Sequence, residues 1–109
     1  MRTGSKVVTT EAILWEWLNA LADASARGIA AEGYRRVQAD SLVEVVPFDP
    51  DLIGAAVSLY GGRTDKDWSL TDCHSFVVMQ RRGISDALTS DHHFEQAGLK
   101  ALMLSLPSA

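Results

Sequence analysis

The stretch LVEVVPFDPDLIGAAVSLYGG, residues 42–62, predicts a strand followed directly by a helix. Its first five residues are mostly β-branched and stop at Pro47, as in a short strand. Asp49–Pro50 suits a helix start because proline is tolerated in the first turn, and Gly61–Gly62 suits the end. The helix is expected to bury an apolar stripe formed by Leu52, Ile53, Ala56, Val57 and Tyr60.

The same alternation of strands and helices extends in both directions from this unit. Upstream we expect a strand ending at Val7–Val8, a helix from a Thr9 or Thr10 cap to about Ser25, and a helix at Ile29–Ala39. The first of these helices is expected to bury Ile13, Leu14, Trp17, Leu18 and Leu21. Downstream we expect a helix at Ser69–Arg82 stopped by Gly83, a strand at Ala87–Ser90, a short helix at His92–Ala97 and a strand at Lys100–Leu104. Strands that alternate with helices imply a parallel sheet covered on both faces, so the predicted class is α/β.

Length and composition indicate one soluble domain over residues 1–109. The net charge of −4 argues against a protein that coats nucleic acid with a broad basic face. No apolar run is long enough to span a membrane, and the N-terminal residues lack the apolar core of a signal peptide. The lone cysteine, Cys73, suits a reducing compartment, so a cytoplasmic location is expected.

Three acidic residues are candidates for chemistry. Glu16 lies at the margin of the apolar stripe of its helix, Asp72 in the first turn of the helix that starts near Ser69, and Asp91 directly after a predicted strand. Each has a structural alternative, namely a solvated helix residue, a capping-box partner of Ser69 and a helix N-cap. If the three converge, their oxygens suit Mg²⁺ or Mn²⁺, and such an ion can activate a water against a phosphodiester.

Other polar and aromatic residues rank below these three. Adjacent His92 and His93 point in different directions on a helix, and without a nearby cysteine pair a zinc site is not expected. Cys73 lies in an apolar helix and is expected to pack rather than react. Trp15, Trp17 and Trp68 are expected in the core or at its rim.

Three stretches of the sequence resemble the PIN domain family, especially VapBC-type toxin ribonucleases. They are VTTEAILWE (residues 8–16), DKDWSLTDC (residues 65–73) and LTSDHHFEQAG (residues 88–98). The resemblance implies a three-layer α/β/α fold with a parallel sheet. It also implies that Glu16, Asp72 and Asp91 are the metal-binding and catalytic acids of an endoribonuclease that uses Mg²⁺ or Mn²⁺. An RNA substrate, an antitoxin protein and a homodimer are the partners implied by the same resemblance.

The resemblance breaks at the N-terminus. PIN domains usually open with a strand that carries an aspartate, whereas residues 1–6, MRTGSK, contain no acid. We therefore expect the first strand and its metal ligand to be absent. Two hypotheses follow: a metal-dependent ribonuclease of the PIN type, or a catalytically inactive PIN remnant that acts as a binding or interaction module.

Overall fold

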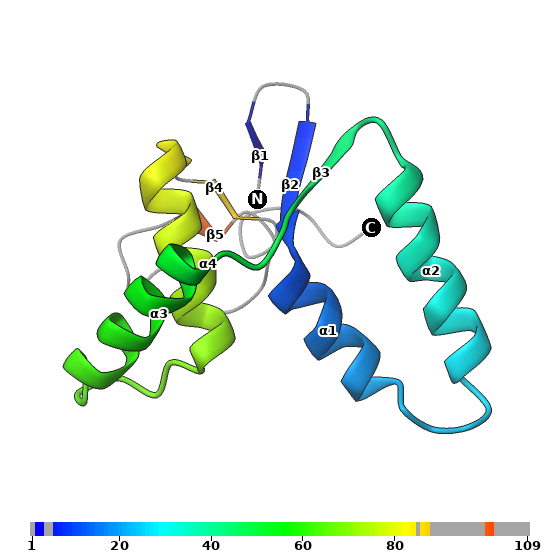
Figure 1. The fold of residues 1–109 in the computed structure, drawn as a ribbon, viewed down its shortest axis with the longest axis horizontal. Helices are drawn as coiled ribbons and strands as arrows, with labels where there is room; N and C mark the ends of the chain where they lie inside the picture. The colour runs from blue at the N-terminus through cyan, green and yellow to red at the C-terminus, as the bar shows by residue number, and fades with distance from the viewer. Residues whose placement is uncertain (1, 4–5, 85, 88–99, 102–109) are drawn as a thin grey trace.

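The computed structural model describes residues 2–3, 6–84, 86–87 and 100–101, and Figure 1 shows their arrangement. In chain order the elements are β1 (Arg2–Thr3), β2 (Lys6–Thr10), α1 (Glu11–Ala20), α2 (Arg27–Ala39), β3 (Val43–Val46), α3 (Pro50–Gly62), α4 (Leu70–Arg82), β4 (Asp86–Ala87) and β5 (Lys100–Ala101). Helices α3 and α4 lie on one side of the β2–β3 pair, and α2 lies on the other (Figure 1). The α/β class predicted from the alternation of strands and helices is confirmed.

Parallel pairing between β2 and β3 forms the centre of the described sheet. The register runs from Val7 opposite Val43 to Thr10 opposite Val46. A second parallel pair joins β4 to β5. Ahead of β2, the two-residue strand β1 pairs antiparallel with it and places Arg2 opposite Val7. Strand β1 carries no aspartate, so it does not supply the acidic ligand that the resemblance leads us to expect in an opening strand.

Helix α4 is the most buried element, and its bounds follow from local signals. Ser69 caps its start, and Gly83 ends it with φ +67°, a left-handed conformation that favours glycine. Every residue from 73 to 79 is buried, so the helix is covered on all sides, as its apolar sequence predicts. The core around it consists of Val8, Val46, Ala56, Trp68, Cys73, Phe76, Val78, Met79 and Ile84.

Helix α1 is shorter than predicted. It ends at Ala20 rather than near Ser25, and the amide of Leu21 closes the last turn by donating to the carbonyls of Trp17 and Leu18. The side chain of Asp23 then accepts hydrogen bonds from the amide and hydroxyl of Ser25. Short polar side chains compete with the helical backbone in this way and favour a turn.

The predicted apolar stripes of α1 and α3 are only partly buried. Leu14 is the one buried residue of α1, and Trp17 stays 41% exposed. On α3, Ala56 is buried at the contact with α4, whereas Ile53, Val57 and Tyr60 are exposed. The stripe prediction for α3 is wrong in extent, because the face that meets the core consists of Leu52, Ala56 and Leu59.

Several predicted segments lie outside the described residues. These are most of the strand at 87–90, the helix at 92–97 and the end of the strand at 100–104. Asp91 falls in the same part of the chain. Within the described ranges, no helix has the length and apolar character needed to cross a bilayer.

Candidate functional site

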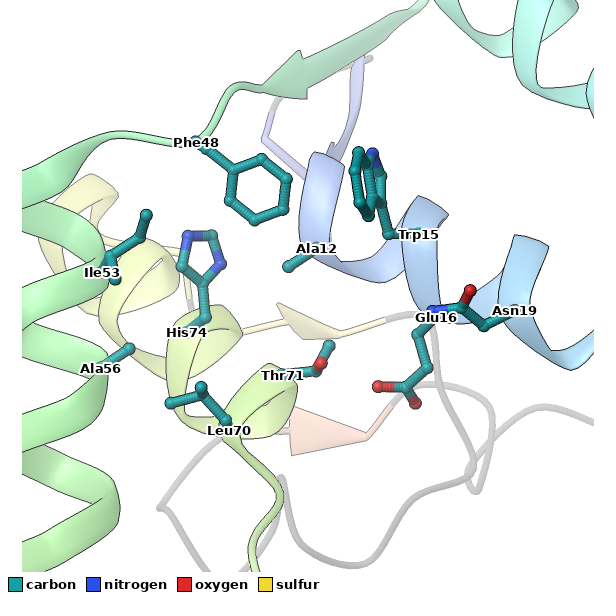
Figure 2. Close-up of a pocket in the computed structure, with 10 residues that line it drawn as sticks. All are labelled: Ala12, Trp15, Glu16, Asn19, Phe48, Ile53, Ala56, Leu70, Thr71 and His74. Atoms are coloured by element: carbon teal, nitrogen blue, oxygen red, sulfur yellow. The ribbon is translucent and has the colours of Figure 1, made fainter.

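A cavity of about 320 Å³ opens between α1, α3, α4 and the connection from β3 to α3 (Figure 2). It is lined by Ala12, Trp15, Glu16, Asn19, Phe48, Ile53, Ala56, Leu70, Thr71 and His74. Its size is near the lower end of the roughly 300–1,000 Å³ typical of small-ligand sites. Apolar and aromatic walls with a few polar groups are also typical of such sites.

Glu16 is the acidic residue of this cavity. Its side chain extends from α1 toward the first turn of α4, where Thr71 lies, and Asn19 sits one turn further along α1 (Figure 2). Within the described ranges, no hydrogen bond or ion pair engages the Glu16 carboxylate. This carboxylate is therefore available to a ligand.

Most other described acids are held by structural partners. Glu11 accepts hydrogen bonds from the hydroxyl of Tyr34 at 3.1 Å and from the amide of Gln38 at 2.7 Å, and so ties α1 to α2. Glu44 on β3 forms an ion pair of 2.6 Å with Arg82 at the end of α4. Unlike Glu11 and Glu44, Glu16 has no partner among the described residues, and its side chain lines the cavity.

Asp72 forms a capping box with Ser69 at the start of α4. The Asp72 amide donates to Ser69 Oγ at 3.0 Å, and Asp72 Oδ2 accepts from the Ser69 amide at 3.2 Å. The capping alternative raised by the sequence is thus confirmed. Asp72 does not line the cavity, although its chain neighbour Thr71 does.

His74 is buried on α4, with only 4% of its surface exposed. In the part of the chain that the structure describes, neither ring nitrogen has a hydrogen-bond partner. Burial lowers the pKa of His74 because the charged ring would lose its hydration. The ring is therefore neutral near pH 7 and presents one donor and one acceptor.

Two exposed aromatic rings lie along one side of the cavity: Phe48 lies beside His74, and Trp15 lies beside Phe48. Phe48 lies 6.3 Å from the His74 ring centroid, and Trp15 meets Phe48 edge to face at 5.8 Å (Figure 2). Trp15 is 57% exposed and Phe48 46% exposed. Trp68, in contrast, is buried against Phe76, as expected for a core residue.

Of the three predicted acidic site residues, the described part of the chain contains two, and only one of them lines the cavity. Glu16 lies in the cavity, Asp72 lies beside it in a cap, and Asp91 is outside the described residues. Among the residues that the structure describes, no group of three or more histidine, cysteine, aspartate or glutamate side chains could hold a metal ion. Cys73 is fully buried and burial raises its pKa, which agrees with the expected packing role.

Sequence reasoning missed His74 and Phe48. The signal for His74 was its place in an otherwise apolar helix, four residues after Leu70 and therefore on the same face. Phe48 follows the proline that ends the strand, and nothing in its local sequence indicates that it reaches α1 and α4.

The fold and the cavity define an α/β protein with parallel strands and an acidic cavity between helices. A family model of the PIN domain matches residues 1–100, and the chain belongs to the PIN domain family. Among solved structures it is similar to VapC20 of Mycobacterium tuberculosis, described as a sarcin-ricin loop cleaving toxin. That similarity has a TM-score of 0.79 and 26% identity, and covers 89% of this chain and 74% of the other. No curated protein matches the chain.

Proposed function

We propose that the chain is a metal-dependent endoribonuclease of the PIN type, and a toxin of a toxin–antitoxin pair. The observation that carries the proposal is the Glu16 carboxylate, which lies without a described partner in a cavity between α1 and α4. The similarity to VapC20, whose description names it a sarcin-ricin loop cleaving toxin, supports the same reaction class.

Glu16, Asp72 and Asp91 are the proposed ligands of Mg²⁺ or Mn²⁺. Their carboxylate oxygens are the donors that these hard cations prefer. The fit is supported at Glu16, where no described cation or amide competes for the carboxylate. Asp72 lies in the first turn of α4, next in the chain to Thr71, which lines the cavity.

The ion, when bound, would activate a water and neutralise charge at the phosphodiester. Residues of this chain would bind the ion and fix the positions of its ligands. Glu16 projects from α1, and the capping box fixes the first turn of α4, so that Asp72 has a defined position. The Thr71 hydroxyl and the Asn19 amide add polar groups beside Glu16.

The substrate, the protein partner, the assembly and the location are proposed on the same grounds. We propose single-stranded or structured RNA as the substrate, an antitoxin as the protein partner, a homodimer as the assembly and the cytoplasm as the location. These assignments rest on membership of the PIN family and on the VapC20 similarity.

One observation favours the alternative of an inactive PIN remnant that serves as an interaction module. The capping box gives Asp72 a structural role that accounts for the residue without a metal ion. On this alternative, divalent ions would neither stabilise the fold nor support cleavage.

RNA cleavage measured with Mg²⁺, with Mn²⁺ and with EDTA tests the proposal. We expect cleavage that requires a divalent ion and falls by about 100-fold or more in Glu16→Gln, because each ~1.4 kcal/mol of lost charge stabilisation lowers the rate tenfold. Glu32→Gln is the matched control, since Glu32 is exposed on α2 and pairs only with Arg35 and Arg36 in the described residues. Cleavage that persists in EDTA, or is unchanged in Glu16→Gln, refutes the proposal.

A further inference from the structure

The cavity has two chemically different parts. Trp15 and Phe48 form an exposed aromatic wall, and their rings meet edge to face at 5.8 Å. Glu16, Asn19 and Thr71 form a polar margin on the opposite side (Figure 2). A ligand that fills the cavity therefore needs an apolar face together with a polar edge.

His74 gives the cavity a buried polar group whose hydrogen-bonding capacity is not satisfied in the described part of the chain. Its imidazole is more than nine-tenths buried, lines the cavity and has no hydrogen-bond partner among the described residues. Buried polar groups are ordinarily paired, so an unpaired one needs an explanation. Phe48, Ile53 and Ala56 on the cavity wall have no polar side-chain atom that could pair with the imidazole.

The charge of the cavity further restricts the chemical class of ligand that could bind. Among the described residues, no lysine or arginine lines it, and Glu16 contributes a negative charge. Without a bound cation to neutralise Glu16, a phosphate group inside the cavity would be repelled. A purely apolar side chain would enter but would leave His74, Asn19 and Thr71 unpaired. A flat, uncharged group with donors and acceptors on its edge satisfies both the aromatic wall and the polar margin.

We propose that this cavity binds one unstacked base of single-stranded RNA, with the base against Trp15 and Phe48 and its edge on His74 and Asn19. Sequence-specific RNA recognition commonly uses bases splayed out onto aromatic rings and hydrogen-bonded along an edge. The inference deepens the proposed ribonuclease function and rests on it, because a base held here places its backbone beside Glu16. The cavity thereby selects the nucleotide next to the cleaved bond.

Uncharged nucleosides are the direct probes, since they contain the base without a phosphate. The full-length chain is titrated with adenosine, guanosine, cytidine and uridine in EDTA, and the affinity is read from ¹H–¹⁵N NMR shifts. We expect at least one nucleoside to bind and to shift the amides around residues 15, 48 and 74, whereas ribose alone does not. Trp15→Ala and Phe48→Ala should each weaken binding by about tenfold, as loss of a stacking ring does.

Matched variants separate recognition from folding. Trp15→Phe keeps a ring and should retain most of the affinity. Tyr60→Ala removes an equally exposed aromatic ring outside the cavity and should leave the affinity unchanged. His74→Phe removes both nitrogens at similar volume and should lower the affinity and reduce the preference among the four nucleosides. Thermal melts of each variant verify that it is folded.

Three results overturn the inference. The first is that the folded chain binds no nucleoside. The second is that Trp15→Ala and Phe48→Ala leave nucleoside binding unchanged. The third is that N-acetyl-leucinamide occupies the cavity but no nucleoside does, which would indicate a peptide-binding groove. Because the titration is done in EDTA, it does not depend on cleavage. Nucleoside binding without metal-dependent cleavage would contradict the ribonuclease proposal alone, and cleavage without nucleoside binding would contradict the base site alone.

Discussion

The capping box at the start of α4 allows the structural and chemical roles of Asp72 to be separated. Ser69→Ala removes the Oγ that accepts from the Asp72 amide at 3.0 Å but keeps the Asp72 carboxylate. Asp72→Asn removes the negative charge but keeps a side-chain oxygen that can accept from the Ser69 amide, a bond of 3.2 Å in the native chain. The first change weakens the cap, and the second removes a proposed metal ligand.

The two changes have different expected magnitudes. Losing an N-cap hydroxyl lowers the free energy of unfolding by about 1 kcal/mol, which lowers Tm by roughly 4–8 °C in a domain near this size. Losing only the charge at a helix N-terminus lowers it by about 0.3–1 kcal/mol. Asp72→Asn should therefore be the more stable of the two variants and yet the less active one.

Thermal unfolding with and without Mg²⁺, together with RNA cleavage, measures both effects. We expect Ser69→Ala to melt lower but to retain stabilisation by Mg²⁺ and cleavage. Asp72→Asn should lose both, although it melts closer to the native chain. If Asp72→Asn keeps full Mg²⁺ stabilisation and cleavage, Asp72 is only a cap and the reasoning fails.

Three further predictions concern the fold. Met79→Ala, at a fully buried position, should lower the free energy of unfolding by about 2–5 kcal/mol in a denaturant titration, and a loss well under 1 kcal/mol would contradict the described core. Gly83→Ala should destabilise α4 by about 1 kcal/mol because φ is +67°, whereas Gly54→Ala, in open space within α3, should be neutral or stabilising by up to about 1 kcal/mol, and equal effects would count against this backbone. The pKa of Asp65 is lowered chiefly by its hydrogen bond from Arg63, so Arg63→Ala should raise it in an NMR pH titration. Any stabilisation by that pair is present at neutral pH and is lost as pH falls through the lowered pKa, and an unchanged Asp65 pKa in the variant would refute the contact.

Local signals predicted the parts of the fold that depend on nearby residues. The strand and helix within residues 42–62 were observed at Val43–Val46 and Pro50–Gly62, because Pro47, Asp49 and the glycine pair act on their immediate neighbours. The start and stop of α4 were predictable for the same reason. The exposure of Val57 was not, since burial of a stripe depends on which helix packs against it.

The site was predictable only in part. The placement of Glu16 at the edge of its helix, next to small and polar residues, indicated a notch, and it does line a cavity. Phe48 and His74 reach that cavity from separate elements, and their meeting is set by how α4 packs beside the β3–α3 connection. No spacing rule within one segment encodes such a contact.

The central claim is that Glu16, Asp72 and Asp91 share one divalent ion. Substoichiometric Mn²⁺ added to the ¹⁵N-labelled chain tests it directly, because the paramagnetic ion broadens the NMR signals of nearby nuclei. The account predicts that the amide signals of residues 16, 72 and 91 broaden together at the same low Mn²⁺ concentration, and that Glu16→Gln reduces the broadening at all three. Broadening at only one of these positions, or at none, would contradict it.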